Sequence, residues 1–194
     1  MLRGTLELGC KGMNFIKLVA AFAPWIVFAL LAGNSLNTVK IAIVVSLAVA
    51  IILGYKDLRA GFILSWATLT FFIFLVITVV FMTNMWILEM MNVLVYVTLA
   101  AVTWIGIIVG RPFVMEYARQ EVDESRWQDP KFIRVVRDMT GFWGVAFLAD
   151  LVIAIYQTTN HDFMLKLALY LVMLIAMMFT LYYPRWVRAR YAQD

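Results

Sequence analysis

Residues 60–82 read AGFILSWATLTFFIFLVITVVFM, a run of 23 residues without one charged side chain. A hydrocarbon core of about 30 Å is crossed by about 20 helical residues, because each adds about 1.5 Å. The run is therefore long enough and apolar enough to cross a membrane. Lipid offers no hydrogen-bond partner to an unpaired backbone, so the run is expected to be a helix.

The rest of the chain has the same character. Of its 194 residues, 64% are hydrophobic and 14% are charged, whereas a soluble domain has roughly 45–50% and 25%. Five more charge-poor runs stand out, and they are 13–32, 38–54, 87–110, 141–157 and 163–183. Two of them are short, 38–54 and 141–157. The sequence predicts an all-α polytopic membrane protein, a bundle of six transmembrane helices forming one integral membrane domain over residues 1–194.

The basic residues predict the orientation, since Lys and Arg accumulate in cytoplasmic loops. With six spans, thirteen of them fall on the side of the N-terminus: Arg3, Lys11, Lys56, Arg59, Arg111, Arg119, Arg126, Lys131, Arg134, Arg137, Arg185, Arg188 and Arg190. The other side has Lys40 and Lys166, and Lys17 lies inside the first span near its cytoplasmic end. Both termini are therefore predicted to be cytoplasmic, with the chain in the cell inner membrane.

The net charge of +4 fits a bilayer with anionic headgroups as the partner better than nucleic acid, because the basic residues lie where headgroups are. Pro24 and the lack of a small-x-small site argue against a cleaved signal peptide at the first span. Cys10 is the only cysteine, so an intramolecular disulfide is excluded.

One connection is long, the cytoplasmic loop 111–140 between the fourth and fifth spans. Pro112 suits a first helical turn, and Asp129 before Pro130 is a second helix start. Two short amphipathic helices at the membrane surface are predicted. The candidate surface residues are Arg111, Phe113, Tyr117, Arg119, Trp127 and Arg134. Packing on the membrane is the preferred interpretation, and docking of a partner protein is the alternative.

The fifth span carries an acid, Asp150, about nine residues from its cytoplasmic start and so near the bilayer midplane. An ionised, unpaired carboxylate there costs several kcal/mol or more, so Asp150 should face the bundle and be neutral or partnered. Hydroxyl residues on other spans fall at a similar depth: Ser46, Thr68, Thr70, Thr98 and Thr103. A polar layer around Asp150 is the candidate intramembrane site.

Two interpretations of Asp150 stay open. It is either a proton or cation carrier in a small transporter, or a neutral acid hydrogen-bonded to a neighbouring helix. Glu89 and Asn92, at the outer start of the fourth span, are secondary candidates.

Most other chemistry has no residues to support it. The one histidine, His161, lies in an external turn, so no multi-histidine metal site and no Ser-His-Asp triad can be built. No glycine-rich phosphate loop is present. No cofactor, metal or catalytic activity is expected.

Several short motifs resemble the bacterial intracellular septation protein A family of small multi-pass inner-membrane proteins. They are FAPWIVF in the first span, the basic turn after the second, RPF at the start of the long loop, Trp127 with Pro130, and FWGVAF after MTG in the fifth span. The family has an asparagine late in the fifth helix, whereas this chain has Asp150 earlier. The resemblance implies a role in envelope synthesis or division.

The sequence thus predicts a non-enzymatic inner-membrane protein of cell-envelope biogenesis or division that acts through membrane protein partners. The alternative is a small proton-coupled transporter or channel that uses Asp150.

Overall fold

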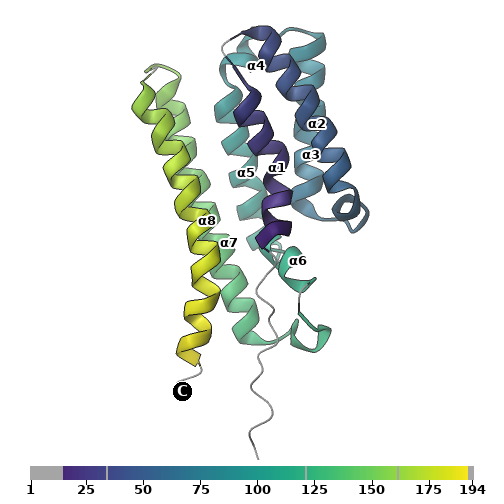
Figure 1. Cartoon of the computed structure of the whole chain (residues 1–194), viewed down its shortest axis with the longest axis vertical. Coiled ribbons are helices and arrows are strands. Elements are labelled where there is room, and N and C mark those ends of the chain that lie inside the picture. The colour runs from purple at the N-terminus through teal and green to yellow at the C-terminus, as the bar shows by residue number, and fades with distance from the viewer. Residues whose placement is uncertain (1–14, 34, 121, 161, 192–194) are drawn as a thin grey trace, which may run out of the picture.

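The computed structural model describes residues 15–33, 35–120, 122–160 and 162–191, and within them every regular element is helical (Figure 1). The predicted start of the first span at Met13 lies outside the described residues, as do Cys10 and His161.

The helices follow the chain in a simple order. The long ones are α1 (Phe15–Leu31), α2 (Leu36–Arg59), α3 (Ile63–Leu75), α5 (Met91–Ile108), α7 (Pro130–Gln157) and α8 (Phe163–Tyr191). The short ones are a π-helical end to α3 (Val76–Phe81), α4 (Met85–Glu89), α6 (Phe113–Arg119) and a 3₁₀ turn (Glu124–Arg126). Below, "the α6 end" means the end of the bundle where α6 lies.

Five helices of the described residues are long and apolar enough to cross a membrane: Leu36–Arg59, Ile63–Phe81, Met91–Ile108, Pro130–Gln157 and Met164–Pro184. The predicted all-helical class is confirmed, and five of the six predicted spans correspond to these helices. The predicted first span corresponds to a shorter apolar helix, Val19–Leu31. The runs 38–54 and 141–157, which looked short in the sequence, lie inside the longer helices α2 and α7.

The start of α7 is determined by its N-cap residue, Asp129, and its first residue, Pro130. The Asp129 side chain accepts a hydrogen bond from the backbone N–H of Lys131 at 2.8 Å, and Pro130 occupies the first helical turn. Nothing interrupts the helix between Pro130 and Gln157. The second predicted loop helix and the predicted fifth span are therefore one continuous helix.

Lys40 secures the opposite end of the bundle. Its Nζ donates to the backbone carbonyl of Val80 at 3.2 Å and to Oγ1 of Thr83 at 2.9 Å. Val80 lies in the π-helical segment that ends α3, where carbonyls lack partners within the helix. A cation at a helix C-terminus also interacts favourably with the helix dipole, so Lys40 ties α2 to the end of α3.

The core is aromatic and centres on α1, which lies between the other helices (Figure 1). Phe22 stacks on Trp143 of α7 with ring centroids 5.0 Å apart, and its edge meets Phe113 of α6 at 6.1 Å. One turn further along, Trp25 lies 4.9 Å from Phe71 of α3. One face of α1 thus joins α3, α6 and α7, and such aromatic pairs contribute about 0.5–1.5 kcal/mol each beyond their buried area.

The last two helices form a long hairpin in which α8 packs against α7 (Figure 1). Their 28 and 29 residues correspond to about 42 and 43 Å at about 1.5 Å per residue, well beyond a hydrocarbon core of about 30 Å. At the α6 end both helices continue past the ends of α1, α3 and α5 (Figure 1). We call the half of the hairpin at this end, residues 130–142 and 179–191, the hairpin arm.

Side-chain stacking holds the hairpin arm together. Phe142 and Phe179 stack at 4.0 Å, and Phe179 stacks on Tyr183 at 4.7 Å. The Tyr183 hydroxyl donates to Oδ2 of Asp138 at 2.8 Å. These contacts join the two helices of the arm to each other.

Candidate functional site

Asp150 lies on the face of α7 that is turned into the protein, with 1% of its surface exposed. Its Oδ1 has no hydrogen-bond partner within the described part of the chain. Burying a carboxyl group whose oxygen is unpaired is costly, more so when it is charged. This is the feature that makes Asp150 a candidate functional group and not an ordinary polar residue.

One phenol lies near this carboxyl group, and a second phenol lies near the first. Tyr96 of α5 is close enough to interact electrostatically with Asp150 and with Tyr170 of α8. Three helices thus bring a carboxyl group and two hydroxyl groups into one region of the bundle. Neither tyrosine was among the predicted site residues. Their positions in the sequence could have indicated a role. Tyrosines of membrane proteins concentrate at the interfaces, whereas these two lie well inside their predicted spans.

Helices α5 and α7 pack closely at Gly144, which precedes Asp150 in α7. A Cβ added to Gly144 would lie 3.0 Å from Cε2 of Trp104 and 3.2 Å from Cγ2 of Thr103. Thr103 is buried, and its hydroxyl donates to the carbonyl of Leu99 at 2.8 Å. Asp150 is six residues beyond Gly144, or about 9 Å along the helix. Thr103 and Asp150 therefore share the interface between α5 and α7 but stand at different levels.

The other predicted hydroxyl residues lie elsewhere. Thr68 is buried between α1 and α3, where it accepts from Nε1 of Trp25 at 3.0 Å. Thr70 and Thr98 line a groove between α3 and α5. Ser46 of α2 is fully buried, and its Oγ has no partner within the described residues. The structure thus distributes the predicted polar layer over several helix interfaces.

The secondary candidates are on the surface. Glu89 ends α4 and Asn92 lies in the first turn of α5, and both are exposed at the end of the bundle opposite α6.

Helix α6 closes the other end of the bundle. Phe113 is 1% exposed and Tyr117 is 2% exposed, and the Tyr117 ring meets Phe62 edge-on at 5.0 Å. These two predicted surface residues are therefore inside the protein. The remaining predicted loop residues, Arg111, Arg119, Trp127 and Arg134, are exposed or partly exposed, and the Arg119 guanidinium lies 5.2 Å from the Trp127 ring centroid.

A second acid, Glu116 of α6, joins two elements at this end. Its Oε2 accepts the backbone N–H of Ile63, the first residue of α3, at 3.0 Å. Burial raises the pKa of Glu116 from 4.5 to about 7, and the Ile63 hydrogen bond and nearby Arg111 oppose that rise. The sequence analysis did not single out Glu116, because its role depends on a neighbour 53 residues earlier.

Fold and site together define a class, a helical protein with five helices long and apolar enough to span a membrane and a buried acid among them in the described residues. No protein-family model matches the chain, and no curated protein or solved structure matches it either.

Proposed function

We propose that this chain is a non-enzymatic multi-pass protein of the bacterial inner membrane, acting in cell-envelope biogenesis or division through contacts with other membrane proteins. The observation that supports a contact role is the hairpin arm, whose two helices pack on each other and continue past the ends of α1, α3 and α5 (Figure 1). The short motifs shared with the intracellular septation protein A family support the cellular process.

The exposed side of the hairpin arm is chemically suited to a protein partner. Arg134 and Arg137 are exposed on α7, and Ile133 and Trp186 add apolar surface nearby on the arm. Arginine and tryptophan are enriched in protein interfaces. The opposite side of α7 is already used, since Val136 is buried in the core.

The proposed topology has six spans, with the α6 end and both termini in the cytoplasm. Two observations support it. The aromatic contacts of α1 with three other helices favour its lying beside them in the bilayer as the sixth span. Basic residues such as Arg59, Arg111 and Arg134 gather at the α6 end, whereas Lys40 and Lys166 lie toward the other end.

Site-specific photo-crosslinking in the native membrane tests the proposal. A photoreactive benzoylphenylalanine replaces Arg137 on the hairpin arm, and the same residue replaces the exposed Trp86 at the opposite end as a matched control. We expect a discrete adduct containing one other membrane protein from position 137 and not from position 86. Equal adducts at both positions, or none at 137, would contradict a partner bound at the arm.

A second candidate function is a small proton-coupled transporter. The unpaired Oδ1 of Asp150, with Tyr96 nearby, favours it, because an ionisable residue within the membrane is a functional candidate by default. The test is proton flux into proteoliposomes that contain a pH-sensitive dye. Flux that the wild-type chain supports and that Asp150→Asn abolishes would favour the transporter, and equal background flux with both would exclude it.

A further inference from the structure

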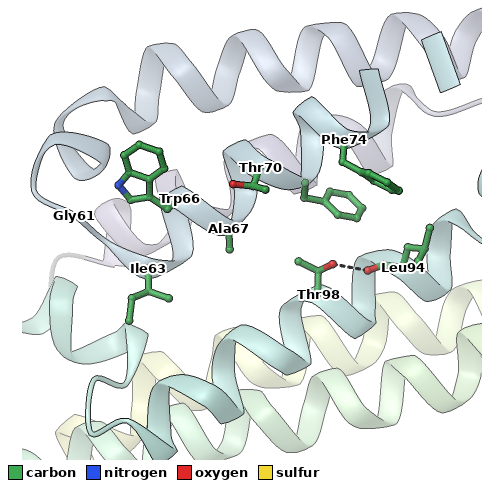
Figure 2. Close-up of a pocket in the computed structure, with 9 residues that line it drawn as sticks. Gly61, Ile63, Trp66, Ala67, Thr70, Phe74, Leu94 and Thr98 are labelled. Carbon is green, nitrogen blue, oxygen red and sulfur yellow. Dashed lines mark hydrogen bonds between the residues drawn. The ribbon is translucent and has the colours of Figure 1, made fainter. Parts of the chain in front are cut away.

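A groove of about 670 Å³ lies between α3 and α5. Its walls are Gly61, Ile63, Trp66, Ala67, Thr70, Phe71, Phe74, Leu94 and Thr98. Figure 2 shows the α3 side chains on one side and Leu94 with Thr98 of α5 on the other. The groove begins at the α6 end, beside Gly61, and runs along α3 for more than three turns to Phe74. Its volume lies within the roughly 300–1,000 Å³ of typical ligand sites.

The groove is built to hold an apolar ligand. Its lining contains no charged side chain, and the Thr98 hydroxyl is already donated to the carbonyl of Leu94 at 2.8 Å (Figure 2). Trp66 and Phe74, at its margins, are exposed. Both walls belong to helices that are apolar enough to cross a membrane, so the medium on the open side consists of lipid chains.

Basic residues stand at the α6 end of the groove. Arg59 is exposed two residues before Gly61, with its guanidinium 5.7 Å from the Tyr55 ring centroid. Arg111 is exposed and close enough to Glu116 to interact with it electrostatically. Glu116 in turn accepts the N–H of Ile63, which lines the groove.

Two acids close to the groove, Glu116 and Asp57, interact with groups of the protein. Besides the bond from Ile63 to Glu116, Asp57 interacts with the Tyr117 and Gln120 side chains and with the charge of Lys17. Arg59 and Arg111 are both exposed at this end. A phosphate matches them, because arginine binds phosphate oxygens with paired N–H groups.

We propose that this groove binds one anionic phospholipid, with an acyl chain between α3 and α5 and the phosphate at Arg59 and Arg111. This inference requires the chain to span a bilayer and goes beyond the proposed partner contact, since the groove and the hairpin arm use different residues.

Native mass spectrometry of the detergent-solubilised chain tests the acyl site, with dioleoyl phosphatidylglycerol as the probe. Thr98→Trp fills the groove, and Val97→Trp places the same side chain one residue away at an exposed position that does not line it. We expect Thr98→Trp to weaken binding of the first lipid by about tenfold or more and Val97→Trp to leave it within about twofold. Equal affinities for the two variants would overturn the proposal. Ala67→Leu, a smaller filling change from the α3 side, replaces Thr98→Trp if that variant does not fold.

The headgroup is tested with the same assay. Wild-type protein should prefer dioleoyl phosphatidylglycerol over dioleoyl phosphatidylcholine, and the double variant Arg59→Gln, Arg111→Gln should lose that preference while still binding the chain. No preference in the wild type, or an unchanged preference in the double variant, would overturn the assignment of the phosphate to these arginines.

Discussion

At the scale of single residues, Asp150 is a carboxyl group buried among helices that are apolar enough to cross a membrane. A carboxyl group facing lipid would be expensive, and α7 avoids that cost by turning Asp150 toward α5, with Tyr96 close by. The sequence could indicate the depth of Asp150 and the need for it to face inward. It could not indicate its neighbours, because helix rotation and pairing are set by packing over the whole length of α5 and α7.

Asp150→Asn should preserve the fold. The amide has the size of the carboxyl group, and Oδ1 makes no hydrogen bond that would be lost. We expect the free energy of unfolding in detergent to change by no more than about 1 kcal/mol, the usual scale of polar contacts in membrane bundles. A loss of about 3 kcal/mol or more would show instead that the carboxyl group holds the bundle together.

Glu116 should make stability depend on pH. Its pKa is raised from 4.5 to about 7 in the folded protein, so the folded state binds more protons than the unfolded state between these values. The contribution of Glu116 to the stability of the folded state is then fully present below about pH 4.5 and is lost as the pH rises toward 7. We expect the thermal midpoint of the wild type to fall over this interval relative to that of Glu116→Gln.

The control for this measurement is Glu124→Gln, which removes an exposed acid from the same loop. It should leave the wild-type pH dependence in place. If the thermal midpoints of Glu116→Gln and of the wild type change in parallel across this pH interval, the assigned role of Glu116 is wrong.

At the scale of elements, the apolar runs predicted the positions of the helices. They did not predict which helices pack together, because that depends on side-chain contacts that hydrophobic periodicity does not reveal. Asp129 and Pro130 marked the start of α7 correctly, yet the absence of any break before Gly141 was not foreseen. Helix α6 read as a surface helix because Phe113 and Tyr117 alternate with charged residues. The structure instead uses these rings against α1 and Phe62.

Close approach of α5 and α7 should make Gly144 sensitive to substitution. In Gly144→Ala the new Cβ would lie 3.0 Å from the Trp104 ring, so this side chain must move by a few tenths of an ångström in a closely packed interface. We expect a loss of about 1–3 kcal/mol in the free energy of unfolding. Gly141→Ala, one turn earlier with nothing within 4 Å of the added Cβ, should be neutral or stabilising by up to about 1 kcal/mol. Equal effects of the two would contradict the close contact.

At the scale of the whole molecule, the arrangement is asymmetric. One end is closed by short turns and by Lys40, and the other carries α6 and the hairpin arm (Figure 1). Composition and charge were enough to predict the class, because both depend on sums over many residues. The projecting arm could not be predicted, since it depends on α7 and α8 continuing together past the spans through contacts such as Phe142 with Phe179.

The proposed orientation predicts the labelling of single cysteines. In a Cys10→Ser background, a cysteine at exposed Gln128 lies at the α6 end and one at exposed Asn160 lies at the opposite end. A membrane-impermeant maleimide added to intact spheroplasts should label Asn160→Cys and not Gln128→Cys. The reverse pattern would invert the topology, and labelling of both in sealed membranes would exclude the proposed arrangement.

The most direct test of the central claim compares the hairpin arm with the intramembrane acid in living cells. Cells depleted of the chain are supplied with the wild type, with Asp150→Asn, or with the double variant Arg134→Glu, Arg137→Glu. Each protein is checked for equal amounts in the membrane, and cell length and septum formation are then measured. If the chain acts through partners at the arm, Asp150→Asn restores normal division and the double arm variant does not. Restoration by the arm variant together with failure of Asp150→Asn would contradict the account and place function at the buried carboxyl group.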